Sequence, residues 1–279
     1  MLKIPLWCAI FFYFTTTIII TSCSTKKYNI LSYNEYKQKN FSSPYFYLLS
    51  TKKYHLGYFG SHHSFHTEDS QFDQLKIAIQ SFQPQVIFIE GGIPSLLSNE
   101  KDMIEKFGEP GFVSFLANQQ SIQIKNIEPN FSEELYHLLD WFDEEDVLVY
   151  YFVREMSLYQ LKHEKLELES YISNFIEDLN YFLPLKKKEP DYIYQLYENT
   201  FHTQFQTNQI NNDLWDPIQE KTIINAISKQ NEIFRNQKMV ENIIKSFNDY
   251  HKVFVVAGSA HAVMQEPALR QFFHELGKR

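Results

Sequence analysis

The chain has 279 residues, a formal net charge of −8, and aromatic side chains at 16% of its positions. Its lysine triplet at 186–188 is predicted to be a solvated loop because prolines flank it, so no basic surface supports nucleic-acid binding. No cysteine follows Cys23, which excludes disulfides, thiolate metal sites and a thiol nucleophile from the remainder of the chain. That remainder is long enough for one domain with a full hydrophobic core.

The first 22 residues are predicted to be a lipoprotein signal peptide. Lys3 precedes a nearly continuous apolar run, and the stretch Ile20-Thr21-Ser22-Cys23 resembles a bacterial lipobox in which Cys23 is acylated. The alternative is an uncleaved transmembrane anchor, because the run is almost long enough to cross a bilayer. Either interpretation predicts an extracytoplasmic remainder tethered to a membrane, with residues 23–43 as a polar tether. In the favoured lipoprotein interpretation the membrane anchor is the lipidated Cys23. The outer membrane, at its periplasmic face, is the expected place.

The first half of the chain alternates between strand and helix patterns. Strands are expected within the aromatic stretch 45–60, then at 86–90 and at 122–128. A helix capped by Asp69 or Ser70 is expected to end before Pro84, and a second helix falls near 112–120. This alternation predicts an α/β fold with a central, mostly parallel sheet flanked by helices.

The second half is dominated by helix patterns. A long helical insertion is expected over 132–250, broken at Pro184, Pro190 and Pro217, with the acidic run 143–146 at a helix start rather than in a metal site. Strand character returns at 253–258, and a last helix is expected from about Pro267. The layout predicts one α/β domain over 44–279, with the insertion preceding the last core strand.

Four ionisable residues follow predicted strands. His63 and His261 each complete a G-x-x-H motif after a strand, and Glu90 and Glu128 follow two other strands. Ligands of open α/β sheets bind beyond the carboxyl ends of the strands, so these side chains converge if the strands are neighbours. Alone, each residue is better explained by a strand-end hydrogen bond or a surface ion pair. The matched set of four favours a functional site.

Two chemistries are compatible with this set. Imidazole and carboxylate groups are ligands for Mn, Co, Zn or Fe, and a divalent metal held by His63, His261, Glu90 and Glu128 would activate a bound water. The metal-free alternative uses one histidine as general base and a glutamate to orient it.

The predicted helix over 232–247 contributes two further candidates. Asn236 falls in the middle of its apolar face, so it needs a buried partner, which the site would supply. Arg235 lies at the rim and either binds a substrate carboxylate or an oxyanion, or forms a surface pair with Glu232 or Glu241. Glu109, in the turn 107–112, is interpreted as a loop residue rather than a fifth member of the site.

The order of several segments resembles the TraB/Tiki superfamily, which includes erythromycin-esterase-like and ChaN-like proteins. The segments are LGYFGSHH, QPQVIFIEGG, IKNIEP, RNQKM and VFVVAGSAH, and the resemblance spans about residues 54 to 275. Two positions depart from the superfamily pattern. Phe234 stands directly before Arg235, where an acidic residue is usual, and Glu128 lies in NIEP rather than after a glycine.

The resemblance implies an α/β core with helical insertions and a site of six residues: His63, Glu90, Glu128, Arg235, Asn236 and His261. Tiki-like members are regarded as metal-dependent peptidases, the erythromycin-esterase-like branch as hydrolases with a histidine base, and ChaN-like members as haem-binding lipoproteins. The expected function is therefore a metal-dependent hydrolase acting on a peptide or small ester. The alternatives are a non-catalytic haem- or metal-binding lipoprotein and an inactive relative that binds peptides.

Overall fold

The computed structural model describes residues 27–161, 167–182, 189–206, 210 and 212–278. The predicted signal peptide, Cys23, Pro184 and the lysine triplet at 186–188 lie outside the described residues. Within the described ranges, no helix is both long enough and apolar enough to cross a membrane.

Five strands form one sheet in the order β1-β2-β5-β3-β4. The strands are β1 (Tyr45–Ser50), β2 (His55–Ser61), β3 (Val86–Ile89), β4 (Gln123–Asn126) and β5 (Lys252–Gly258). β1 pairs antiparallel with β2 at one edge, and all other pairs are parallel. The predicted α/β class with a mostly parallel sheet is confirmed.

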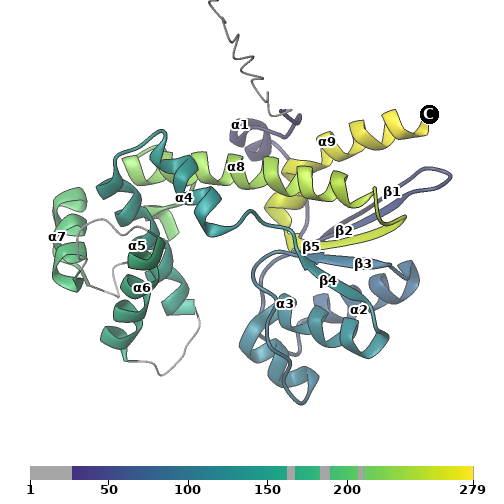
Figure 1. Ribbon diagram of the computed structural model, residues 1–279, viewed down its shortest axis with the longest axis horizontal. Helices are drawn as coiled ribbons and strands as arrows, with labels where there is room; N and C mark the ends of the chain where they lie inside the picture. Colours follow the sequence, from purple (N-terminus) through teal and green to yellow (C-terminus); the bar gives the residue numbers. More distant parts are fainter. Residues whose placement is uncertain (1–26, 162–166, 183–188, 207–209, 211, 279) are drawn as a thin grey trace, which may run out of the picture.

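Helices cover both faces of the sheet (Figure 1). α2 (Ser70–Phe82) and α3 (Glu100–Gln120) pack on one face, where Phe59, Ile87 and Phe254 are buried. α8 (Ile223–Ser246) and α9 (Ser259–Gly277) pack on the other face, over alternate residues of the same strands such as Tyr58 and Val255. Burial on both faces explains why these strands read as continuous apolar runs.

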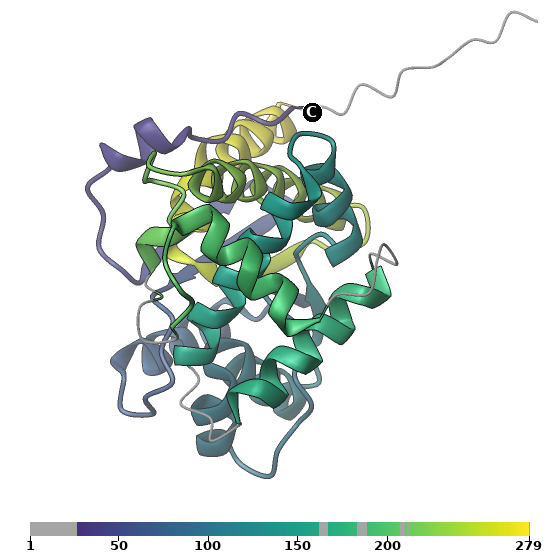
Figure 2. The same cartoon turned by 90° about the vertical axis from the view of Figure 1, so that its left-hand side faces the viewer.

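The helical insertion builds a second hydrophobic cluster. It contains α4 (Phe131–Leu139), α5 (Glu144–Leu161), α6 (Leu168–Phe182), α7 (Pro190–Phe201) and the short 3-10 helix η2 (Asn212–Leu214). Figure 2 looks onto these helices. The long helix α8 joins the two parts, because Ile224 and Ile227 pack in the insertion while Met239 and Ile243 pack against the sheet.

The described part of the expected tether is packed on the domain. The backbone of Tyr28 exchanges two hydrogen bonds with the side chain of Gln237, at 2.7 and 2.8 Å. Leu31 N donates to Met264 O at 2.9 Å, and α1 (Tyr33–Lys37) follows with Tyr33 buried. Residues 28–37 therefore lie against α8 and α9 rather than acting as a free linker.

Two helix boundaries differ from the sequence expectation. α9 begins at Ser259 rather than near Pro267, because the chain turns into helix directly after Gly258 and carries Pro267 inside. α3 runs through the expected turn, although Gly108 takes φ 59° and ψ −138° and breaks the helix. Pro110 then falls in the first turn of the second segment, where its missing N–H costs nothing.

Candidate functional site

Three neighbouring strands bring the first site residues together. β5 lies between β2 and β3, with Ser61 of β2 opposite Gly258 and Ile89 of β3 opposite Val256. His63 follows β2, His261 lies in the first turn of α9 after β5, and Glu90 directly follows β3. These side chains therefore start from the same edge of the sheet, as the sequence predicted.

Glu90 uses both carboxylate oxygens in this arrangement. Its Oε2 accepts the Gly258 N–H at 2.7 Å, and its Oε1 accepts from Arg235 Nη2 at 3.0 Å. The His261 Nε2 atom lies 3.2 Å from the same Oε1. Burial by itself would raise the pKa of Glu90, but His261, Arg235 and His63 outweigh it and hold the pKa well below its usual value.

Asn236 orients His261 from the other side of the ring. The Nδ1 atom of His261 lies 3.0 Å from Asn236 Oδ1, which also accepts from Gln265 Nε2 at 2.8 Å. Because an amide oxygen only accepts, Nδ1 carries a proton and Nε2 is the atom that faces Glu90. Burial opposes charge on this ring, yet Glu90 and Glu232 raise the pKa of His261 above its usual value.

Arg235 lies at the centre of the acidic side chains. It is 5% exposed, and its guanidinium donates to Glu90, Glu128 and Glu232, with Glu128 accepting from Nε at 3.0 Å and also from Nη2. Such burial is tolerable only when every charge is paired. Arg235 does pair with Glu232, which was one of the two expected partners. The pair is buried, however, and does not lie on the surface as expected. Arg235 is already engaged by carboxylates rather than free for a substrate.

Glu128 joins the site through the loop after β3 as well as through Arg235. Its Oε2 accepts the Gly91 N–H at 2.8 Å, directly beside Glu90 in the chain. This hydrogen bond, from the Gly91 backbone to the Glu128 side chain, connects the loop after β3 to the loop after β4. Of the six predicted site residues, Glu90, Glu128, Arg235, Asn236 and His261 form one contiguous hydrogen-bonded cluster.

His63 stands at the open side of this cluster. Its side chain is 64% exposed, and its backbone is left-handed, with φ 49°. A Cβ atom added at Gly258 would lie 3.0 Å from His63 Nε2 and 3.5 Å from Glu90 Oε2. The absence of a side chain at Gly258 therefore leaves room for the His63 ring to approach Glu90.

Glu109 supports His63 from behind, and its interpretation as a plain loop residue is wrong. The residue is buried in α3, and its Oε1 accepts from Ser64 N at 2.7 Å and from Gln71 Nε2 at 2.8 Å. Its Oε2 lies 3.6 Å from His63 Nδ1. The Glu109 carboxylate raises the pKa of His63 to about 9.

Two acidic side chains lie beside Arg235 on the insertion side; sequence reasoning left out Glu134 and named Glu232 only as a surface partner. Glu134 of α4 lies 4.0 Å from Arg235 Nε and accepts from Asn231 Nδ2 at 3.0 Å, and Glu232 Oε2 lies 3.6 Å from His261 Nε2. The spacing of Glu232 and Arg235 on one helix was a usable signal. No sequence pattern pointed to Glu134, because only the packing of α4 on α8 brings its carboxylate close to Arg235.

The four predicted metal ligands, His63, His261, Glu90 and Glu128, already have other partners or lie apart. Among the described residues, no group of three or more His, Cys, Asp or Glu side chains is arranged to hold an ion. The oxygens of Glu90 and Glu128 face the Arg235 guanidinium and backbone N–H groups, which supply the positive charge that a metal would otherwise bring. The four donors do not fit a divalent ion in this arrangement, and metal binding stays a prediction.

Comparisons with known proteins add no neighbour: no family model, no curated protein and no solved structure matches this chain. The TraB/Tiki resemblance therefore depends on its motifs and stays a prediction.

Two cavities of about 620 Å³ lie away from the cluster, one beside β1 and α2 and the other between α5 and α6.

Proposed function

We propose that this chain is a hydrolase of TraB/Tiki type that cleaves a peptide or small ester bond outside the cytoplasm, anchored to a bacterial membrane through Cys23. The observation that carries the proposal is that His63 Nε2 and Glu90 Oε2 both lie beside Gly258, 3.0 and 3.5 Å from the position that a Cβ there would take, with Glu109 behind His63. A carboxylate behind one ring nitrogen, with the other nitrogen facing an open edge, is the arrangement that general-base catalysis uses.

In this proposal His63 is the base and Glu90 positions the water. Water donates one hydrogen to Glu90 Oε2, which accepts only the Gly258 N–H among the described groups, and the other to His63 Nε2. The oxygen attacks the carbonyl carbon, and protonated His63 then gives its proton to the departing amine or alcohol. Glu109 stabilises the imidazolium that forms between these two steps.

The remaining residues hold Glu90 ionised and stationary. Arg235 and His261 both contact its Oε1, and Asn236 fixes the His261 ring. The N-terminus of α9 begins directly after Gly258 without a side-chain cap, so its partial positive charge lies at the same edge. That charge favours the oxyanion of the tetrahedral intermediate.

Activity of the full chain on a panel of peptides and nitrophenyl esters tests the proposal. His63→Ala and Glu90→Gln are each expected to lower kcat/KM about 100-fold or more. The matched control is His62→Ala, because His62 is the neighbouring exposed histidine and pairs with Asp69 at 2.7 Å, away from Glu90. Activity that survives both site substitutions would sink the proposal.

Metal content distinguishes the two versions of the mechanism. A metal-dependent reaction with Mn, Co, Zn or Fe requires Arg235 to release carboxylate oxygens to the ion. Elemental analysis of the native protein beside the His63→Ala/His261→Ala variant decides between them. Stoichiometric metal in the native protein that is lost in the double variant would support the metal-dependent mechanism over the metal-free one.

A further inference from the structure

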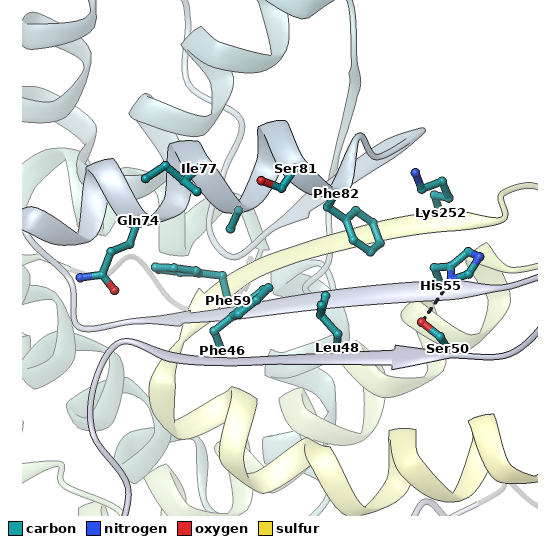
Figure 3. Close-up of a pocket in the computed structure, with 11 residues that line it drawn as sticks. Phe46, Leu48, Ser50, His55, Phe59, Gln74, Ile77, Ser81, Phe82 and Lys252 are labelled. Carbon is teal, nitrogen blue, oxygen red and sulfur yellow. Dashed lines mark hydrogen bonds between the residues drawn. The ribbon is translucent and has the colours of Figure 1, made fainter.

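A groove with apolar walls runs between the edge strand β1 and helix α2 (Figure 3). Phe46 and Leu48 line it from β1, Phe59 from β2, and Ile77 and Phe82 from α2, around a volume of about 620 Å³. The opposite face of β1 is ordinary core, because Tyr47 and Leu49 are buried. The sheet therefore presents apolar side chains on a face that no described helix covers at β1.

The walls of this groove are unusually exposed for apolar residues. Leu48 is 54% exposed and Ile77 is 63% exposed, and Phe46 is exposed beside them. A contiguous apolar surface of this kind marks a binding site more often than a single exposed leucine does. Burying these side chains under a ligand would remove their apolar area from water, which favours binding.

Two of the lining rings, Phe46 and Phe82, pack on the fully buried ring of Phe254. The Phe254 ring lies 6.2 Å from the Phe46 ring and 5.5 Å from the Phe82 ring, measured between centroids. Gly57 lies opposite Leu48, and a Cβ there would come within 2.6 Å of the Phe254 ring. Glycine at this position therefore leaves room for the Phe254 ring that supports these two lining rings.

One end of the groove is cationic. Ser50, His55 and Lys252 lie side by side on β1, β2 and β5. This row lies about 13 Å along the sheet from Phe46, because Ser50 is four residues further along β1. Lys252 Nζ lies 5.5 Å from the Phe82 ring centroid, and no described carboxylate pairs with it. The lining contains no Asp or Glu, although the whole chain carries a net charge of −8.

We propose that this groove binds a single-chain amphiphile, with its acyl chain along Phe46, Leu48 and Ile77 and its anionic headgroup at Lys252. The charge at one end selects an anionic head, and the uncharged walls select an alkyl body. This site is separate from the proposed hydrolase site. Lys252 and Gly258 stand at opposite ends of β5, six residues or about 20 Å apart.

Photolabelling of the full chain tests the site with a dodecanoate that carries a diazirine near its terminal carbon. Labelled peptides are mapped by mass spectrometry, and saturable labelling is expected within 46–59 and 74–82. Unlabelled dodecanoate should compete at least fivefold better than dodecanol, which has no charge. Leu48→Gln should reduce labelling at least fivefold, whereas Leu96→Gln, an exposed leucine at 49% outside the groove, should not.

The headgroup is tested with a matched pair of lysines. Lys252→Gln should remove the preference for dodecanoate over dodecanol. Lys106→Gln should retain it, because Lys106 also lies over a phenylalanine ring, at 5.4 Å from the Phe107 centroid, but not in the groove. Labelling that is unsaturable, or that persists in Leu48→Gln, would overturn the proposal. Labelling of the groove only by a phospholipid probe in vesicles would overturn it in favour of a membrane contact. Crosslinks between two copies of the chain would overturn it in favour of a self-association surface.

Discussion

The Nδ1 atom of His261 donates to Asn236 Oδ1 across 3.0 Å, so one amide decides which ring nitrogen faces Glu90. Asn236 itself is held in place, because its Nδ2 donates to Glu232 O at 2.8 Å. The second G-x-x-H histidine is therefore locked inside the cluster, whereas His63 of the first motif stands at the open edge. The two motifs are equivalent in sequence and unlike in setting.

Asn236→Ala is expected to destabilise the domain by about 1–3 kcal/mol, because His261 Nδ1 and Gln265 Nε2 both lose a buried acceptor. The measurement is urea unfolding at constant pH. Asn242→Ala is the control on the same helix, since Asn242 makes one half-buried bond to Ile127 O at 2.8 Å. Equal losses in the two variants would contradict the assigned role of Asn236.

Arg235→Met is expected to cost about 3–5 kcal/mol at pH 7, because three carboxylates lose their shared cation inside the protein. Arg270→Met, which removes an exposed pair with Glu266, should cost less than about 1 kcal/mol. Chemical denaturation of both variants measures the difference.

The cost of Arg235→Met should also depend on pH in a stated direction. Burial raises the pKa of Glu90 and Glu232, but Arg235 and His261 bring both below 4.5, so their contribution is present above that pH and lost below it. Without the guanidinium these groups take up protons at higher pH. The penalty should therefore shrink as the pH falls from 7 towards 4.5, and a constant penalty would show that the carboxylates are not coupled to Arg235.

The pKa of His63 is expected near 9, because the Glu109 carboxylate favours the imidazolium. A folded pKa above the ordinary value of 6.5 means that this contact stabilises the fold at pH below 6.5 and is lost as the pH rises through about 9. NMR titration of the His63 ring measures the pKa directly.

Glu109→Gln should move the pKa of His63 down towards 6.5, and Glu68→Gln, an exposed carboxylate in the same loop, should leave it in place. If His63 is the general base, hydrolysis should rise with pH through the pKa measured for His63. The rise should shift to lower pH in Glu109→Gln. If the pKa of His63 is unchanged in Glu109→Gln, the proposed role of Glu109 behind His63 is wrong.

The two motif glycines are expected to respond differently to substitution by alanine. A Cβ at Gly258 meets the end of the exposed His63 ring at 3.0 Å, so Gly258→Ala should fold but lower hydrolysis at least tenfold. A Cβ at Gly60 meets Ala262 Cβ at 2.8 Å and Ser259 Cα at 2.9 Å, atoms that cannot move away separately. Gly60→Ala should therefore lose about 1–3 kcal/mol in thermal or urea unfolding. Equal stability of the two variants would contradict this division.

Much of the fold was accessible from local pattern. The β-branched run at 86–89 and the apolar run at 253–258 identified buried parallel strands, and the Asp69 cap and Pro84 bounded α2. The start of α9 was missed because a proline is a strong helix-start signal, although Pro267 is here accommodated inside the helix. β1 became an antiparallel edge strand because a four-residue connection allows only a hairpin.

The sequence by itself determined which side chains leave the carboxyl ends of the strands, because strand ends are marked by glycines and by the end of an apolar run. It therefore identified His63, Glu90, Glu128 and His261. Only the tertiary structure decided that Arg235 occupies the centre of three carboxylates and that Glu109 lies behind His63. Apart from the i,i+3 pair Glu232–Arg235, those contacts join residues from 46 to 145 positions apart, and no local pattern records the packing of α8 and α3 that brings them together.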